Sequence, residues 1–152
     1  MQTFLPYADF RASAEVLDDK RLGKQRVEAL QVMRALILPD YGWQRHPVTT
    51  MWRGFRPALM AYQEATCRVW LERGHADTCL GKTLADLALV PEDLEAYERG
   101  TYEVPSWNTD ERVHESHRSK LVQKAPEHYR PLFPDAADDL AYFWPGTVAH
   151  TT

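Results

Sequence analysis

One short block of the chain gathers cations on the turns ahead of the carboxylate of Glu28. Residues 17–28 read LDDKRLGKQRVE, with Arg21, Lys24 and Arg26 on the turns that precede Glu28. Residues four apart share one face of a helix, so this spacing predicts an ordinary ion pair between Lys24 and Glu28 on a solvated surface. The alternative interpretation is that the block carries chemistry, since its cations suit phosphate groups.

A second block interleaves cations with aromatic side chains. Residues 117–121 read HRSKL, and residues 126–133 read PEHYRPLF. The cations suit phosphates, and His128 and Tyr129 can stack on an unpaired base. The competing interpretation is a helix that docks through Leu121 and continues into an aromatic tail packed in the core.

A metal site is the weakest chemical interpretation of the sequence. His114, Glu115 and His117 resemble a zinc-protease motif, but that motif places its histidines four residues apart, and no third ligand stands out here. Cys67 and Cys79 are too far apart for a paired-cysteine zinc motif. We expect no metal and no cofactor, and a metal-dependent hydrolase stays a third alternative.

Helices must position these blocks, because the sequence has no run of alternating strands. Apolar residues recur at helical spacing between the prolines. We expect one helix over residues 18–38, a short one that begins at Pro47, and a second one that follows Pro57 and runs to about residue 73. Two more are expected over residues 83–90 and 111–124. For residues 91–111, which are acidic and contain two prolines, we expect a loop or a short, exposed helix. The aromatic, proline-rich tail from Tyr129 onward is expected to wrap the core. The predicted fold class is an all-α, compact helical bundle.

Length and composition fit a single domain over residues 1–152. The chain is 44% hydrophobic and carries a formal charge of −4, which argues against a generic basic nucleic-acid binder. The charge is uneven, because residues 20–73 hold ten basic and four acidic side chains, so a local basic surface remains possible. With no signal peptide and no apolar run of membrane-spanning length, we expect a cytoplasmic monomer.

Taken together, the two blocks resemble the pyrimidine-dimer DNA glycosylase (endonuclease V) family. The first block matches the phage members at Leu17, Asp19, Leu22 and Glu28, and the last block matches them at Ser119, Lys120, Leu121, His128, Tyr129 and Arg130. The KRLGKQR and HYRPLF signatures are most similar to an uncharacterised bacterial cytoplasmic branch. This resemblance implies a compact, single-domain, all-helical protein.

The resemblance also implies a specific reaction. In the family the N-terminal α-amine attacks C1′ of the target deoxyribose, expels the base and leaves a Schiff base, while the glutamate that matches Glu28 assists; β-elimination then cuts the strand. Here residue 2 is glutamine, whose bulk blocks removal of the initiator methionine, so the amine is expected to belong to Met1. The segment before Leu17 is longer than in the phage members.

The leading prediction is a DNA-repair glycosylase with AP-lyase activity that acts on damaged or modified DNA. Met1 and Glu28 are the candidate catalytic residues, and His46 is a candidate for lining the pocket. The candidate DNA-contact residues are Arg21, Lys24, Arg26, His117, Arg118, Lys120, Tyr129 and Arg130. The alternative prediction is a non-catalytic nucleic-acid or nucleotide-binding module of the same fold.

Overall fold

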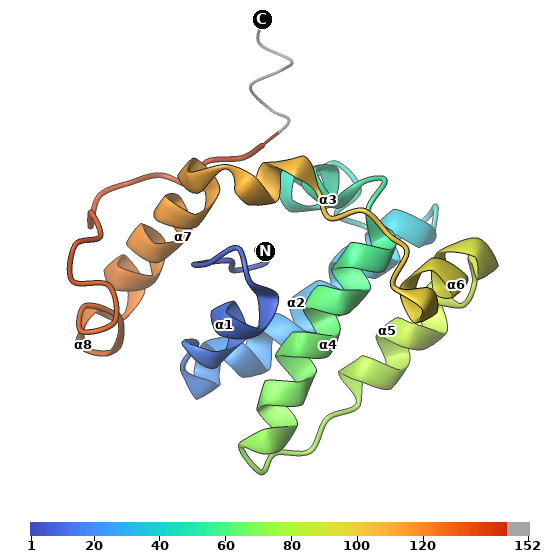
Figure 1. The fold of residues 1–152 in the computed structure, drawn as a ribbon, viewed down its shortest axis with the longest axis horizontal. Helices are drawn as coiled ribbons and strands as arrows, with labels where there is room; N and C mark the ends of the chain where they lie inside the picture. The colour runs from blue at the N-terminus through green and yellow to red at the C-terminus, as the bar shows by residue number, and fades with distance from the viewer. Residues whose placement is uncertain (146–152) are drawn as a thin grey trace, which may run out of the picture.

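The chain folds into helices joined by short loops. The computed structural model describes residues 1–145, and every regular element within them is helical. In chain order these are α1 (Phe10–Glu15), α2 (Asp19–Ile37), α3 (Pro47–Trp52), α4 (Arg56–Glu72), α5 (Cys79–Leu87), α6 (Pro91–Arg99), the 3₁₀ helix η1 (Ser106–Thr109), α7 (Glu111–Lys124) and α8 (Pro126–Tyr129) (Figure 1). The all-α fold class is confirmed for this part of the chain. None of the helices described combines the length and the apolar character needed to cross a membrane.

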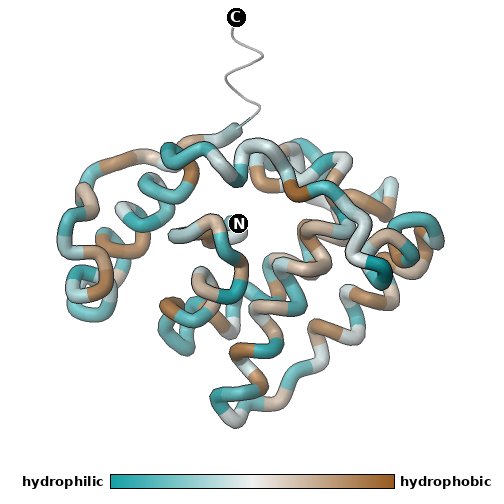
Figure 2. The backbone as a smooth tube through the Cα atoms, viewed as in Figure 1, coloured by the Kyte–Doolittle hydropathy of each residue, from teal (hydrophilic) through white to brown (hydrophobic). Residues whose placement is uncertain are grey.

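Helices α2 and α4 pack against each other through the apolar faces that their sequences predict. Leu22, Ala29 and Met33 recur at helical spacing along α2, and all three are buried. From α4, Leu59 and Tyr62 are buried in the same cluster as Ala29 and Met33, and Val69 is buried in the cluster that contains Leu22. Figure 2 shows the corresponding pattern, with hydrophobic and hydrophilic segments alternating along the helices.

Helices α2 and α4 come close together at Gly23. A Cβ atom at this position would lie only 3.0 Å from the ring of Trp70 on α4. Trp70 is itself held in place, because its indole N–H donates to the carbonyl of Ala76 across 2.9 Å and its ring stacks on His75. The missing side chain of Gly23 therefore lets a bulky ring pack directly on the first long helix.

Helix α5 begins at Cys79, so the predicted start at Thr83 is wrong. The carboxylate of Asp77 accepts hydrogen bonds from the N–H groups of Cys79 and Leu80, at 3.2 Å and 2.9 Å, and so satisfies the helix start. Thr83 lies inside the helix, where its hydroxyl donates to the carbonyl of Cys79 across 2.7 Å.

Residues 91–111 were expected to form either a loop or a short, exposed helix, and their first part forms the helix α6. Helix α6 contains no buried residue. It ends at Gly100, whose φ of 67° is the left-handed conformation that glycine adopts most readily.

The C-terminal part packs its aromatic side chains inward. Tyr129 and Phe133 are buried with Leu121, and Tyr142 lies against Phe4 with ring centroids 6.3 Å apart. The described part of the tail after α8 has no regular element and follows the helices, as predicted. This arrangement brings α7 and the tail to the same side of the fold as the first residues of the chain (Figure 1).

Candidate active site

The N-terminal segment, residues 1–5, runs through the middle of the fold and has no regular secondary structure (Figure 1). Residues 2–5 are all buried, and a buried backbone without regular structure needs hydrogen-bond partners from side chains. Gln25 of α2 provides two of them. Its amide nitrogen donates to the carbonyl of Gln2 across 2.6 Å, and its oxygen accepts from the N–H of Phe4 across 2.8 Å.

Three further helices hold the same segment. The indole N–H of Trp52 in α3 donates to the hydroxyl of Thr3, and the hydroxyl of Tyr62 in α4 donates to the carbonyl of Phe4. His117 of α7 accepts from the N–H of Leu5 across 2.8 Å. The first residues are therefore fixed from α2, α3, α4 and α7 together.

Glu28 lies beside the start of this segment. The N–H of Gln2 donates to Oε2 of Glu28 across 3.4 Å, so the α-nitrogen of Met1 is one residue away from the carboxylate. The Glu28 side chain is only 13% exposed, and Lys24 Nζ lies 3.7 Å from its other oxygen. The Glu28 carboxylate, which is largely buried, thus lies between the lysine and the residue that follows the α-amine.

His46 lies close to the same amine. Its Nδ1 accepts from the N–H of Val48 across 3.0 Å and so caps the start of α3. Burial lowers the pKa of His46, and the positive charge of the N-terminus lowers it further. The lowered pKa favours the neutral imidazole at pH 7, and His46 both caps a helix and lies within electrostatic reach of the N-terminus.

The negative charge of Glu28 also affects the pKa values of two tyrosine side chains. Burial raises the pKa of Tyr142 to about 12, and the negative charge of Glu28 adds to the rise. Burial likewise raises the pKa of Tyr62 well above its ordinary value, with a further contribution from Glu28. Both hydroxyls stay protonated at neutral pH, so the carboxylate is the group at this site that carries negative charge.

The structure divides the predicted DNA-contact residues into two groups. Lys24 and Lys120 lie beside the site: the Lys24 side chain is 74% exposed, whereas the Lys120 ammonium lies over the Tyr142 ring, 5.2 Å from its centre. Arg21 is near them but is paired with Asp18 at 3.1 Å.

The remaining predicted contacts are engaged inside the protein. His117 and Tyr129, two of the predicted DNA-contact residues, are fully buried in this structure. Arg26, another of them, pairs with the buried carboxylate of Asp77 and lies over the ring of Trp70 at 4.4 Å.

Arg118 and Arg130 serve mainly to hold backbone. Arg118 donates to the carbonyl of Pro6 across 2.7 Å and pairs with Glu111. Arg130 donates to three carbonyls of the tail, those of Phe133, Pro134 and Ala136.

The sequence interpretation missed two features of the site. Gln25 stood among the charged residues of the first block, but nothing local indicates that its amide binds the N-terminal segment. Trp43 lies in the loop between α2 and α3, and its ring contacts His46 with centroids 5.7 Å apart. The only sequence feature that could have drawn attention to Trp43 is its place directly after Tyr41 and Gly42, in a turn.

The two histidines proposed as metal ligands are used as hydrogen-bond partners of the N-terminal segment. Nδ1 of His114 lies 2.7 Å from the carbonyl oxygen of Leu5, and its Nε2 lies 2.8 Å from that of Asn108. Nδ1 of His117 is engaged by the N–H of Leu5. Within residues 1–145 no three potential ligands gather in a way that would hold a metal ion.

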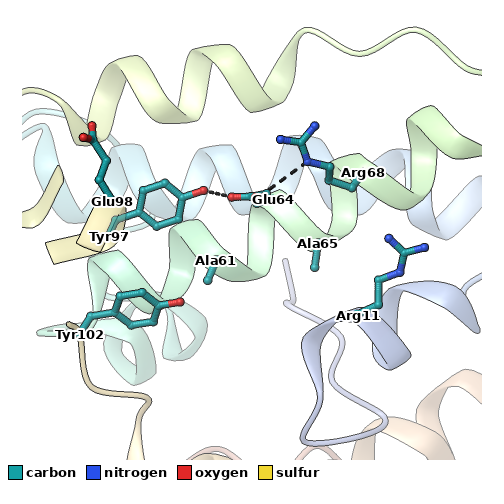
Figure 3. Close-up of a pocket in the computed structure, with 8 residues that line it drawn as sticks. All are labelled: Arg11, Ala61, Glu64, Ala65, Arg68, Tyr97, Glu98 and Tyr102. Carbon is teal, nitrogen blue, oxygen red and sulfur yellow. Dashed lines mark hydrogen bonds and ion pairs between the residues drawn. The ribbon is translucent and has the colours of Figure 1, made fainter. Parts of the chain in front are cut away.

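A separate pocket of about 550 Å³ lies between α1, α4 and α6 (Figure 3). Figure 3 shows the hydroxyl of Tyr97 directed at Glu64, which also pairs with Arg68. Arg11, on the other side of the pocket, is paired with Glu72. Three of its charged groups are thus already neutralised by neighbours, and neither Met1 nor Glu28 lines it.

Comparison with known proteins supports the family resemblance. Residues 1–83 match the family described as pyrimidine dimer DNA glycosylase. This matched part contains the N-terminal segment, Gln25, Glu28 and His46, and thus most of the site described above. Searches of the curated proteins and of the solved structures each find no match to the chain.

Proposed function

Because this chain belongs to the pyrimidine dimer DNA glycosylase family, we propose that it cleaves DNA by glycosylase and AP-lyase chemistry at the Met1 α-amine, with Glu28 assisting. Family membership makes it a DNA-repair glycosylase with DNA as its substrate. The finer mechanism rests on one observation, the hydrogen bond from the N–H of Gln2 to Glu28. Through it, the amine and the carboxylate reach one sugar together.

An α-amine suits the nucleophilic step. Its ordinary pKa is near 8, so a useful fraction is neutral at pH 7, whereas a lysine needs a shift of about three units to match it. In the proposed step the neutral amine bonds to C1′, and the base leaves with the electrons of the glycosidic bond. Loss of the amine proton and opening of the sugar then give the Schiff base.

Glu28 is proposed to stabilise the positive charge that develops on the sugar as the base departs. Carboxylates do this in other glycosyl transfers with oxocarbenium-like transition states. After the Schiff base forms, removal of a proton from C2′ expels the 3′ phosphate and breaks the strand. The same carboxylate is placed to assist this proton transfer.

The amine in this proposal belongs to Met1 rather than to residue 2. The Gln2 side chain is buried, and its main-chain N–H is engaged by Glu28. Removal of Met1 would convert this N–H to the terminal amine of a glutamine, which tends to cyclise. Retention of Met1 leaves a free amine just outside the buried segment.

The test is borohydride trapping on a duplex that contains an abasic site. We expect a covalent adduct with the wild-type chain and none when Gly-Ser precedes Met1. Lys24 is the matched control because its ammonium is the nearest competing amine, 3.7 Å from Glu28. Lys24→Arg keeps the positive charge and should keep the adduct.

Two other outcomes lead to different conclusions. An adduct that survives the N-terminal extension but disappears in Lys24→Arg would identify the lysine as nucleophile and reject the Met1 mechanism. Absence of any adduct, together with salt-sensitive DNA binding, would favour the alternative of a non-catalytic binding module, which requires only the exposed cations.

A further inference from the structure

Trp43 is an exposed tryptophan on a strained backbone. Trp43 is 52% exposed, although it is a large hydrophobic residue. Its φ of 70° lies in the left-handed region, and Trp43 is the only non-glycine residue among residues 1–145 with a positive φ. A bulky residue in this region is a conformational outlier, and such outliers concentrate at functional sites.

The loop that carries Trp43 is braced, so the position of the ring is defined. Gln44 donates to the carbonyls of Leu38 and Pro39, at 2.8 Å and 2.7 Å. Arg53 donates to the carbonyl of Gln44 across 2.9 Å, and the N–H of His46 donates to the carbonyl of Trp43 across 3.1 Å. These bonds hold the strained turn and leave the indole facing outward.

A chain of ring contacts connects Trp43 with the candidate active site. The Trp43 ring meets His46, His46 meets Trp144 with centroids 5.8 Å apart, and Trp144 meets Tyr142 at 5.4 Å. Tyr142 lies in turn against Phe4 of the N-terminal segment, with centroids 6.3 Å apart. The ring contacts therefore lead from Trp43 to the segment that begins with Met1.

A cation accompanies the exposed ring. Arg45 is exposed two residues after Trp43, and it makes no ion pair or hydrogen bond within the described part of the chain. An exposed aromatic face beside a free cation is the combination that proteins use to bind an unpaired base together with its phosphate.

We propose that Trp43 is a stacking platform for an unpaired nucleobase of the DNA at the site of attack, with Arg45 contacting the adjoining phosphate. The inference rests on the proposed function, because the α-amine defines which sugar lies nearby. A base displaced from the duplex would rest on the indole while its neighbouring sugar faces Met1 and Glu28. The strain at residue 43 then serves to present the ring.

The test measures binding without the reaction. A duplex carrying a tetrahydrofuran abasic analogue binds but forms no Schiff base, because the analogue has no C1′ hydroxyl. The fluorescent base 2-aminopurine is placed opposite the analogue in one duplex and beside it on the same strand in another. The duplex whose 2-aminopurine emission is quenched by the wild-type protein identifies which base stacks on Trp43.

Trp43→Gly separates a binding role from a structural one. Glycine adopts a positive φ without strain, so the melting temperature of this variant should be equal to or above that of the wild-type protein. Its affinity for the abasic duplex should be about five- to a hundredfold weaker, and the quenching should disappear. Trp43→Phe should fall between the two, and Leu89→Ala, which removes an exposed apolar side chain from another part of the surface, should bind as the wild-type protein does.

The proposal would be overturned by wild-type affinity and unchanged 2-aminopurine emission in Trp43→Gly, or by a clear loss of its folding stability. Borohydride trapping keeps the two proposals separate. An adduct combined with no role of Trp43 in binding rejects the stacking platform and leaves the lyase mechanism standing. Weaker binding by Trp43→Gly without any adduct supports the platform and rejects the lyase.

Discussion

The main-chain N–H of Gln2 donates to Oε2 of Glu28 across 3.4 Å, and this contact joins two parts of the chain separated by α1 and by the first half of α2. Glu28 is fixed by its helix, whereas the N-terminal segment has no regular structure of its own. The segment depends on side chains from four helices to hold the Met1 amine near the carboxylate. Stability of the segment and chemistry at the amine are therefore linked.

Replacing Glu28 by glutamine should suppress the reaction while preserving the fold. Glutamine keeps an oxygen that can accept from the N–H of Gln2, but it cannot take up the proton that leaves C2′ in the elimination that cuts the strand. We expect strand cleavage at an abasic site to slow by about 10²- to 10⁴-fold, as measured in single-turnover assays. Unchanged cleavage by a folded Glu28→Gln protein would contradict the role of Glu28.

Replacing Gln25 by alanine should loosen the N-terminal segment. The change leaves the carbonyl of Gln2 and the N–H of Phe4 buried without their partners. We expect the free energy of unfolding in urea to fall by about 2–4 kcal/mol. Gln123→Ala is the matched control, because its amide also makes two hydrogen bonds but is exposed, and its loss should change stability by less than about 1 kcal/mol.

Protonation of His117 should destabilise the protein in mildly acidic solution. Its Nδ1 accepts from the N–H of Leu5, so adding a proton there breaks that bond, and burial lowers the pKa of His117 to about 3. The unfolded chain, with an ordinary histidine pKa of 6.5, binds this proton more readily. The stabilising contribution of the neutral ring is therefore complete above pH 6.5 and is lost as the pH falls toward 3, by up to about 5 kcal/mol.

Urea denaturation between pH 7 and 5 measures this effect, because the carboxyl groups whose pKa values are lowered lose their contribution mainly below about pH 5. His46, whose pKa is also lowered, contributes in the same direction. His117→Asn keeps an acceptor for Leu5 but cannot titrate, so its stability should depend less on pH. An equally steep loss in His117→Asn would assign the acid sensitivity to other groups.

The sequence predicts the helices well because their signals are local. The apolar spacing along α2 and the proline after it predict residues 18–38, and the helix runs over Asp19–Ile37. The predicted start of α5 at Thr83 is wrong. The helix begins at Cys79, because the side chain of Asp77, two residues earlier, accepts hydrogen bonds from its first N–H groups.

The site is predictable in part. Glu28 follows from the family resemblance, but the accessibility of the cations and aromatics depends on partners far away in sequence. The hydroxyl of Tyr129 bonds to Asp18, and Arg26 pairs with Asp77. No local pattern distinguishes such buried groups from exposed ones of the same type.

Lys24 should contact phosphate without supporting the fold. Its ammonium is largely exposed and its pairing with Glu28 is loose, at 3.7 Å. Lys24→Gln should weaken binding to any DNA sequence and reduce the slope of log K against log salt by about 1. The melting temperature should stay within the error of the wild-type value, and an unchanged salt slope would remove Lys24 from the DNA-contact surface.

Arg26 comes from the same block but should behave in the opposite way. Its guanidinium pairs with Asp77, whose side chain is only 2% exposed. Burial raises the pKa of that carboxyl, but hydrogen bonds from the N–H of Leu80 and from Arg26 outweigh it and hold the pKa below its ordinary value. Arg26→Gln leaves this charge buried without its partner, and the free energy of unfolding should fall by about 3–5 kcal/mol.

The salt slope of DNA binding by the Arg26→Gln protein, measured at a temperature where it is folded, should equal that of the wild-type protein. A double variant that also changes Asp77 to Asn removes the unpaired charge and should recover part of the lost stability. If the single variant is stable but loses one unit of salt slope, then Arg26 reaches DNA by leaving Asp77, and the two basic residues of this block act alike.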